Sequence, residues 1–295
     1  MPQTVVRFAL FGNEYQARKS AAIEQVLHHL NDRNAEVMVE KKYFDFLQEH
    51  FDVPFSASQV FEQQDFEADY AISLGGDGTL LTAASCVAEK QIPIIGINMG
   101  RLGFLADIAP EEFPMILDHV YAGKAHIEEH TAIDIQTEGE QISGIPYALN
   151  DIAILKRDHA SMISINATID QKLVANYQAD GLIVSTPTGS TAYNLSNGGP
   201  IIAPDTANLC ITPVAPHSLT IRPIVVSDDS EIELSIESRS HTYLVAIDGR
   251  SEPLHQTTKI RIRKAPFTIR IVKRDEHQYF DTLRQKLMWG ADQRQ

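Results

Sequence analysis

Cysteine and long apolar runs are scarce in this sequence, and their scarcity excludes two classes of protein. Only Cys86 and Cys210 occur among 295 residues. They lie far apart in the chain, so a small disulfide-stabilised scaffold is excluded. Both have apolar neighbours, and we expect them to be small buried side chains. No stretch approaches the ~20 apolar residues of a membrane-spanning helix, so we expect no membrane partner.

Positive charge is also in short supply. The chain has 25 lysines and arginines against 39 aspartates and glutamates, for a net charge of −14. This balance argues against broad binding to nucleic acid or to anionic membranes, although it leaves room for a local basic pocket. Residues 5–12 read as a strand and not as the apolar segment of a secretory signal. We therefore expect a cytoplasmic protein with no nucleic-acid partner.

Two common nucleotide-binding signatures are missing. The sequence contains no GxxxxGK[ST] motif and no GxGxxG motif. The first absence leaves the chain without the lysine that a P-loop offers to phosphate, and the second means that a Rossmann site for hydride transfer is not supported.

What is present indicates two domains, and 295 residues are enough for both to bury a core. In the first part, apolar strand-like runs alternate with helical periodicity, which is typical of parallel βαβ units. From about residue 125 to 273 the pattern changes to period-two alternation, which indicates antiparallel strands. We predict an α/β domain with a parallel sheet at 1–125, a β-rich sandwich-like domain at 126–274, and a C-terminal helix in 275–295 that packs back on the first domain. The expected elements of the first part are strands at 5–12, 36–43, 70–74 and 92–97 and helices at 14–31, 43–51 and 79–88.

The most informative stretch is Gly75-Gly76-Asp77-Gly78-Thr79, which lies between a predicted strand and a predicted helix. Such a turn presents free backbone N–H groups at the positive end of a helix, and this suits phosphate. Asp77 would repel phosphate, so we expect it to bind a cation or to accept a proton from an attacking hydroxyl. The ordinary alternative is a tight turn in which Asp77 caps the helix.

A second glycine-rich stretch, residues 96–105, follows the next predicted strand. Because ligands of parallel α/β sheets sit beyond the carboxyl ends of the strands, both loops are expected at one edge. The alternative is a linker in which the glycines are needed only because the backbone adopts positive φ angles. Phe104 could cover a ligand, stack on a base or belong to the core.

Two further stretches lie in the predicted β-rich domain. Asn150-Asp151 follows an apolar run, and an amide beside a carboxylate matches the two hydroxyls of a ribose; an ordinary turn pair is the alternative. Residues 180–193 contain a buried strand and then several small hydroxyl residues before a predicted helix at 190–195. Hydroxyl groups at a helix start offer donors to phosphate or ribose, whereas the alternative is a capped turn.

Taken together, these stretches resemble the NAD kinase family. The resemblance rests on GGDGT at 75–79, GINMGRLGFL at 96–105, LND at 149–151, DGLIVSTPTGSTAY at 180–193, ITPVAPHSLTIRPIV at 211–225 and the Ile247-Asp248-Gly249 turn. It covers nearly the whole chain in the family's order. GGDGT alone is shared with diacylglycerol and sphingosine kinases, so the combination is what makes the resemblance specific.

The resemblance implies an enzyme that moves the γ-phosphoryl of ATP to the 2′-hydroxyl of the adenosine ribose of NAD, giving NADP. Asp77 corresponds to the family's proton acceptor. Mg²⁺ would arrive with ATP, no protein metal ligand is expected, and the enzyme would be a homodimer or homotetramer. The implied NAD-binding residues are Asp77, Gly78, Phe104, Asn150, Asp151, Ser161, Asp180, Thr188, Thr191, Ala192, Tyr193, Asn194, Leu195, Ser196, Ala215 and Arg250. The implied ATP- or phosphate-binding residues are Gly75, Gly76, Gly78, Thr79, Asn98, Gly100 and Arg101.

Two other functions stay open at this point. The first is a kinase of a different alcohol, such as a lipid headgroup; the Asn150-Asp151 pair and the 180–193 stretch favour a dinucleotide instead. The second is a dinucleotide sensor that kept the pocket without catalysis. Asp77 argues against a sensor, because a sensor has no use for a base among phosphate-binding glycines.

Overall fold

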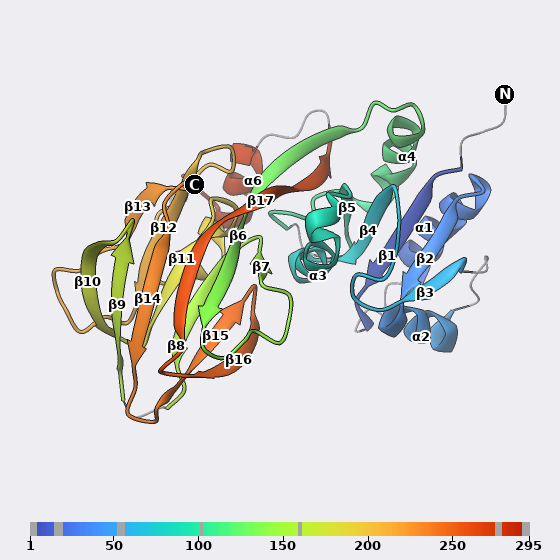
Figure 1. Ribbon diagram of the computed structural model, residues 1–295. Coiled ribbons are helices and arrows are strands. Elements are labelled where there is room, and N and C mark those ends of the chain that lie inside the picture. The colour runs from blue at the N-terminus through green and yellow to red at the C-terminus, as the bar shows by residue number, and fades with distance from the viewer. Residues whose placement is uncertain are drawn as a thin grey trace. The chain divides into compact units, whose positions relative to one another are not determined.

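The structure is a computed structural model that describes residues 5–14, 20–51, 57–100, 103–158, 161–274 and 279–290. The chain forms two compact units: residues 1–129 together with 269–295, and residues 130–268 (Figure 1). We call them unit 1 and unit 2. Both boundaries fall inside long strands, β6 (His126–Glu138) and β17 (Lys259–Lys273).

Unit 1 is an α/β structure built on a parallel sheet, as the alternation of strands and helices predicts. The sheet order is β3-β2-β1-β4-β5-β17, with every neighbouring pair parallel. The last strand joins through its final residues, which pair Ile271 with Ile94. The elements are β1 (Arg7–Gly12), α1 (Ser20–Asp32), β2 (Glu36–Glu40), α2 (Lys41–His50), β3 (Gln59–Phe61), β4 (Tyr70–Gly75), α3 (Asp77–Val87), β5 (Ile94–Asn98), α4 (Phe113–Tyr121) and α6 (Tyr279–Leu287).

Helices α1, α2 and α4 bury their apolar stripes in one core cluster with alternate residues of the strands, including Leu10, Val39 and Ile72. Helix α3 is made mostly of small and apolar residues and is largely buried. Its Leu80 lies so close to Gly96 of β5 that a Cβ at Gly96 would come within 2.7 Å of it. This tight fit fixes the start of α3 against the ends of β4 and β5, where the candidate loops begin.

Unit 2 is a β-sandwich. One sheet contains β10-β9-β14-β17 with β6 and β7, and the other has the order β13-β12-β11-β8-β15-β16. In β14 the inward residues Ile232, Leu234 and Ile236 are buried among residues of both sheets. The remaining elements are β7 (Tyr147–Ala148), β8 (Asp151–Lys156), β9 (Ile163–Ile169), β10 (Lys172–Ala179), β11 (Gly181–Ser185), α5 (Tyr193–Ser196), β12 (Asn208–Val214), β13 (Ile224–Ser227), β14 (Ile232–Glu237), β15 (Thr242–Ile247) and β16 (Arg250–His255).

The fold class is confirmed, but several local predictions are corrected. The segment expected as a helix at 190–195 is a 3₁₀ turn, Thr188–Thr191, followed by the single turn of α5. Residues 15–19 of the helix expected at 14–31 and residues 275–278 of the expected C-terminal segment lie outside the described residues, and α6 ends at Leu287. Leu283 of α6 is buried, whereas Phe280 of α6 and the following Met288 are exposed. Both cysteines are buried and free, as expected.

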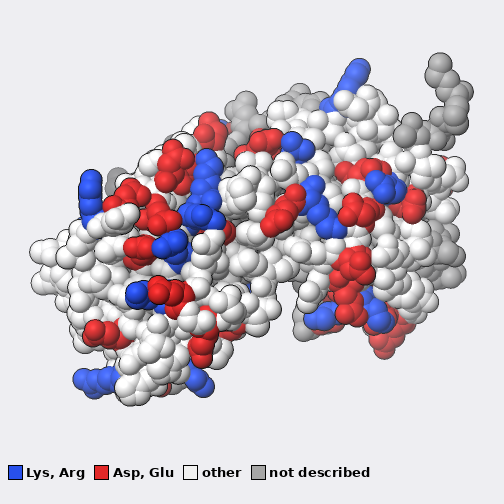
Figure 2. Space-filling view, in the orientation of Figure 1, with Lys and Arg blue, Asp and Glu red and all other residues white. Residues whose placement is uncertain are grey.

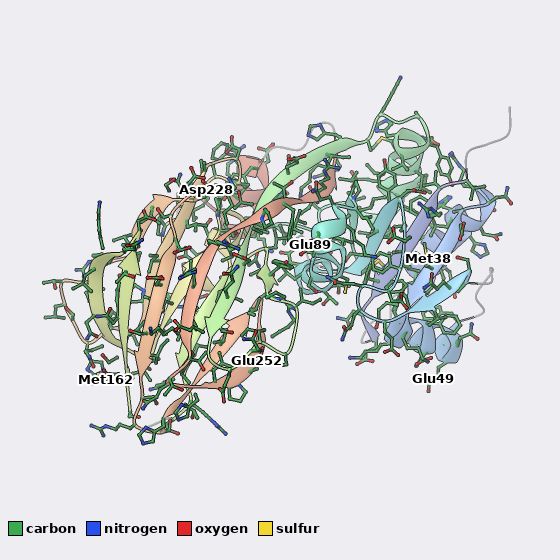
Figure 3. All side chains as sticks on the ribbon, in the orientation of Figure 1. Met38, Glu49, Glu89, Met162, Asp228 and Glu252 are labelled. Carbon is green, nitrogen blue, oxygen red and sulfur yellow. The ribbon has the colours of Figure 1, made fainter. Side chains whose placement is uncertain are left out.

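Acidic and basic side chains lie side by side on the face shown in Figure 2. Ion pairs between described residues include those of Arg261 with Glu231 and Glu233. Glu252, labelled in Figure 3, accepts hydrogen bonds from the backbone and hydroxyl of Ser143 and so fixes the loop after β6. Within the described residues, every helix is too short or too polar to cross a bilayer.

Candidate functional site

In unit 1 the candidate site begins where β4 ends and α3 starts. Gly76 is the N-cap residue of α3, and Asp77 is its first helical residue. Gly75 must lack a side chain, because a Cβ there would come within 2.1 Å of Thr79 Oγ1. At Gly76 and Gly78 a Cβ would meet nothing within 4 Å. These two backbones therefore border open space at the positive end of the helix, which suits an anionic ligand.

The Asp77 carboxylate accepts three hydrogen bonds from consecutive backbone N–H groups of the second glycine-rich loop. Phe104 N–H donates to Oδ2 at 2.9 Å, and Leu105 and Ala106 N–H donate to Oδ1 at 3.0 Å each. A Cβ at Gly103 would come within 2.1 Å of Oδ1, so glycine is required for this close approach. Asp77 therefore ties the two loops together and does not serve as the helix cap.

Two lysines from the C-terminal segment support this carboxylate. Lys286 of α6 places its Nζ 3.3 Å from Asp77 Oδ2 and 4.6 Å from the centroid of the Phe104 ring. Lys273 at the end of β17 is buried, donates to Leu105 O at 3.0 Å and pairs with Asp107 at 3.4 Å. The peptide that accepts from Lys273 is the one whose N–H, on Ala106, donates to Asp77. A buried cation thus polarises one of the donors to the carboxylate.

The remaining residues predicted for phosphate contact differ in their surroundings. Asn98 uses its side chain within the loop, donating to Ala106 O at 3.0 Å and accepting from Gly100 N–H at 2.7 Å. Thr79 is buried, with its N–H donating to Gly76 O at 3.1 Å. Arg101 lies outside the described residues.

In unit 2 a second aspartate holds the Asn150-Asp151 pair. Asp248, in the turn between β15 and β16, accepts from the backbone N–H groups of Leu149, Asn150 and Asp151 at 2.7, 2.8 and 3.1 Å. Its φ is +46°, and the following Gly249 has φ +79°. Aspartate and glycine tolerate this left-handed conformation, so the hairpin can turn its carboxylate onto the start of β8.

The carbonyl groups of the same segment are held from the other side. Thr186 donates its hydroxyl to Leu149 O at 2.5 Å and its N–H to Asn150 O at 2.9 Å. A Cβ at Gly189 would come within 2.0 Å of Asn150 O, so only glycine fits there. The Asn150 Oδ1 atom, in contrast, is buried without a hydrogen-bond partner in the described structure. An unpartnered buried amide oxygen is costly unless a ligand or water satisfies it.

The two neighbouring aspartates have altered acidity. Burial, and then the like charge of Asp248, raise the pKa of the Asp151 carboxyl from 3.8 to about 7. Burial also raises the pKa of Asp248, against the opposing effects of its three N–H donors and of Arg250. Asp151 is 6% exposed. A carboxyl that titrates near neutral pH can accept or donate a hydrogen bond to a sugar hydroxyl.

The 188–196 segment divides into inward and outward residues. Thr188 is buried and its hydroxyl lies 2.9 Å from His130 Nδ1. Asn194 is fully buried; its amide donates to Ser190 O and Pro200 O, and its oxygen accepts from Thr212. Tyr193 is 38% exposed. The side chains at the surface or partly exposed in this segment are those of Thr191, Ala192, Tyr193, Leu195 and Ser196.

The other predicted residues of unit 2 lie at the ends of its strands. Asp180 forms an ion pair with Lys156 at 2.7 Å. Arg250 donates to the carbonyls of Ile247 and Tyr147 at 3.2 and 2.9 Å, so its guanidinium braces the Asp248 turn. Ala215 has a φ of +44°, and Ser161 is partly exposed.

Sequence reasoning missed three contributors: Lys286, Lys273 and the carboxylate of Asp248. The Asp-Gly dipeptide at 248–249 was a recognisable turn signal, but a turn signal does not reveal which N–H groups the aspartate accepts. Lys286 lies 209 residues from Asp77, and it has no motif of its own. Among the described residues, no group of three or more His, Cys, Asp or Glu side chains is arranged to hold a metal ion.

Comparison with known proteins covers both units. The profile of the ATP-NAD kinase N-terminal domain matches residues 8–125, and that of the ATP-NAD kinase C-terminal domain matches residues 149–274. An NAD kinase of Bacteroides fragilis is 51% identical over 289 residues, which are 98% of this chain and 100% of the relative. An NAD kinase of Porphyromonas gingivalis is 40% identical over 97% of this chain and 98% of its own length.

Solved structures agree in fold. The crystal structure of an NAD kinase from Archaeoglobus fulgidus in complex with ATP superposes with a TM-score of 0.73, at 26% identity over 96% of this chain and 98% of that chain. Yeast NADH kinase complexed with NADH superposes with a TM-score of 0.89 over 99% of this chain and 89% of its own. Its identity of 22% makes it a likeness of fold alone.

Proposed function

The chain belongs to the NAD kinase family, and on that basis we propose how its residues perform the reaction. The protein is an enzyme that phosphorylates NAD with ATP. In the proposed reaction, the 2′-hydroxyl oxygen of the adenosine ribose forms a bond to the γ-phosphorus of ATP. The bond from that phosphorus to the bridging oxygen breaks, ADP leaves with the electron pair, and Asp77 takes the hydroxyl proton.

The observation that carries this proposal is the fixed position of the Asp77 carboxylate. A ribose hydroxyl is a poor nucleophile at neutral pH, so a carboxylate held beside it is needed to take its proton during transfer. Three backbone N–H groups orient the carboxylate, and its side chain keeps 28% exposure. It lies next to the open backbones of Gly76 and Gly78. The proposed proton acceptor, Asp77, and the backbones proposed to bind phosphate, those of Gly76 and Gly78, are therefore adjacent in the chain.

In unit 2 we assign the ribose of NAD to Asn150 and Asp151. The buried Asn150 Oδ1 lacks a partner in the described structure, and a ribose hydroxyl would satisfy it. Asp248 and Thr186 hold the backbone on which these two side chains stand. The outward residues of the 188–196 segment would contact the rest of the dinucleotide.

Mg²⁺ suits this chain as a partner of the nucleotide. Magnesium in kinases keeps several waters and is held by substrate phosphates with one or two carboxylates. Both oxygens of Asp77 already accept N–H groups, so the donor set fits a metal carried chiefly by the phosphates of ATP. When bound, the ion neutralises charge on the phosphates.

We further expect a cytoplasmic enzyme that assembles as a homodimer or homotetramer, as its family resemblance implies. Size-exclusion chromatography with light scattering measures the mass of the particle directly, against 32.8 kDa for one chain. A mass of one chain at all working concentrations would contradict the predicted assembly.

The decisive experiment combines an assay with one substitution. Purified enzyme is incubated with Mg²⁺, ATP and NAD, and NADP is measured with an NADP-specific dehydrogenase. We expect Asp77→Asn to lower kcat by at least about 100-fold, because a neutral amide cannot take the proton, while calorimetry shows NAD binding retained. Glu49→Gln removes the same charge from an exposed site on α2 (Figure 3) and should leave kcat unchanged. Wild-type turnover in Asp77→Asn would remove Asp77 from the role of base.

A further inference from the structure

The lone pairs of Asp77 are fully occupied in this structure. Oδ1 accepts the N–H groups of Leu105 and Ala106, and Oδ2 accepts the N–H of Phe104 together with the ammonium of Lys286. A carboxylate oxygen has two lone-pair directions. A substrate hydroxyl can therefore donate to Asp77 only if one of these four donors gives way.

Lys286 is the donor that can leave. The three N–H groups belong to a turn that is fixed by Asn98 and by the buried Lys273. Lys286, in contrast, makes the longest of the four contacts, 3.3 Å, and its side chain is 32% exposed. Its four-carbon stem is flexible. Its ammonium also lies 4.6 Å from the centroid of the Phe104 ring, so it has an interaction partner besides the carboxylate.

The charges that change during the reaction indicate where the displaced Lys286 ammonium would go. When a hydroxyl surrenders its proton to Asp77, the carboxylate loses its negative charge and Lys286 loses its ion-pair partner. Negative charge remains on the phosphoryl group beside the same loop. The sequence supplies no GxxxxGK[ST] lysine for that group. Within the described part of unit 1, Lys286 is the cation that contacts Asp77 directly.

We propose that Lys286 is a catalytic residue that yields its place on Asp77 Oδ2 to the NAD hydroxyl and then contacts the phosphoryl group being transferred. This inference rests on the proposed role of Asp77 and adds a residue to it. It makes two opposite predictions for a neutral substitution. NAD binding is not weakened, because the competitor on Oδ2 is gone, whereas phosphoryl transfer slows, because a cation is missing from the transition state.

The test measures kcat and the Michaelis constants for NAD and MgATP in Lys286→Met. Methionine has a long, unbranched side chain like that of lysine but carries no charge. We expect kcat to fall on the order of 10- to 100-fold and KM for MgATP to rise. Calorimetry should show NAD affinity unchanged or up to about threefold tighter, the scale of an exposed ion pair. Lys286→Arg should recover most of the turnover, since it restores a cation. Arg284→Met is the matched control, because Arg284 lies on the same helix and pairs with Asp281; its kinetics should equal those of the wild type.

A chemical rescue experiment distinguishes the loss of the ammonium charge from a loss of correct folding. In Lys286→Cys, 2-bromoethylamine converts the new thiol to an aminoethyl side chain that carries the ammonium at lysine's length. The two native cysteines are buried, so the exposed thiol reacts first. Recovered turnover after alkylation supports the proposal even if Lys286→Met folds poorly.

Three results would overturn the proposal. The first is a Lys286→Met enzyme with wild-type kcat and KM. The second is weaker NAD binding in that variant at an unchanged melting temperature. The third is an inactive Lys286→Cys enzyme that alkylation does not restore. A wild-type enzyme that forms no NADP would instead refute the proposed function itself, so the two failures are distinguishable.

Discussion

Each unit uses one aspartate in the same way, and the two cases differ in what surrounds the carboxylate. Asp77 in unit 1 accepts the N–H groups of residues 104–106, and Asp248 in unit 2 accepts those of residues 149–151. Both therefore order a segment at the end of a strand: residues 104–106 follow β5, and residues 149–151 lead into β8. The Asp77 side chain, however, is 28% exposed and contacts a lysine. The Asp248 carboxyl, in contrast, is buried, and this burial raises its pKa. In the proposed function the partly exposed Asp77 takes part in the chemistry, whereas the buried Asp248 positions other residues.

The largest expected effect is on the free energy of unfolding, and it tests whether Asp248 matters more for stability than Asp77 does. In Asp248→Ala, three part-buried N–H groups of the 149–151 segment lose their acceptor, and each unsatisfied group costs about 1–3 kcal/mol when fully buried. Alanine also tolerates the φ of +46° less well than aspartate. We expect the free energy of unfolding to fall by about 3–6 kcal/mol, measured by urea denaturation followed by circular dichroism.

Asp77→Ala is the matched variant for this measurement. Its carboxylate is partly exposed, so water can replace it on the N–H groups, and we expect a smaller loss of stability with a near-complete loss of turnover. If both alanine variants lost the same stability and the same activity, the distinction between a chemical and a positioning aspartate would be wrong.

The second effect concerns pH and the carboxyl that Asp248 helps to position. Asp151 has a pKa raised from 3.8 to about 7, so the native state keeps its proton across a range in which the unfolded chain has lost it. The native state thus binds more protons, and its stability falls as pH rises from about 4 to about 7. Above pH 7 this contribution is constant. The slope from one such group is about 1.4 kcal/mol per pH unit.

Asp151→Asn removes this titration. We expect the unfolding free energy of the variant to vary less between pH 4 and pH 7 than that of the wild type, in urea denaturation series at fixed ionic strength. Asp229→Asn changes the same kind of group at an exposed position of unit 2 and is the control. Equal slopes in Asp151→Asn and the wild type would show that Asp151 does not titrate as its surroundings indicate.

Sequence reasoning located the loops but not their connections. The glycine spacing around Asp77 and the change of periodicity near residue 125 were visible, because each reflects local backbone demands or local alternation. The partners of Asp77 were not visible, since residues 104–106 and Lys286 are brought to it only by the packing of β5 and α6. The C-terminal helix shows the same limit. Both Phe280 and Leu283 are apolar residues of α6, yet Phe280 is 60% exposed and Leu283 only 5%.

The helix predicted at 190–195 was correct only for residues 193–195, which lie in α5, because its first residues belong to a 3₁₀ turn. Hydroxyl residues gave a helix-start signal, but here they bond to carbonyls within the turn, as Thr191 does to Thr188 O at 3.4 Å. Such local hydrogen bonds compete with regular helix. The result is a 3₁₀ turn before the single turn of α5.

The smallest expected effect is on kcat in Gly103→Ala, and it tests whether the contact of this loop with Asp77 matters for turnover. A Cβ on this residue would come within 2.1 Å of Asp77 Oδ1 and 2.8 Å of Ala106 O, so Gly103→Ala forces the carboxylate and the 104–106 turn apart. Because reacting groups must be held within a fraction of an ångström, we expect kcat to fall about 10-fold. The free energy of unfolding should fall as well, because Leu105 and Ala106 of this turn are buried.

Gly144→Ala is the control, because Gly144 is exposed outside the proposed site and a Cβ there would meet nothing within 4 Å. Its kcat should stay within about twofold of the wild type, the range of a surface substitution. If Gly103→Ala were as active as Gly144→Ala, the contact between the loop and Asp77 would not be required for turnover. Asp77 would then resemble Asp248 more closely than its surroundings suggest, as an acceptor that orders a loop and takes no part in the chemistry.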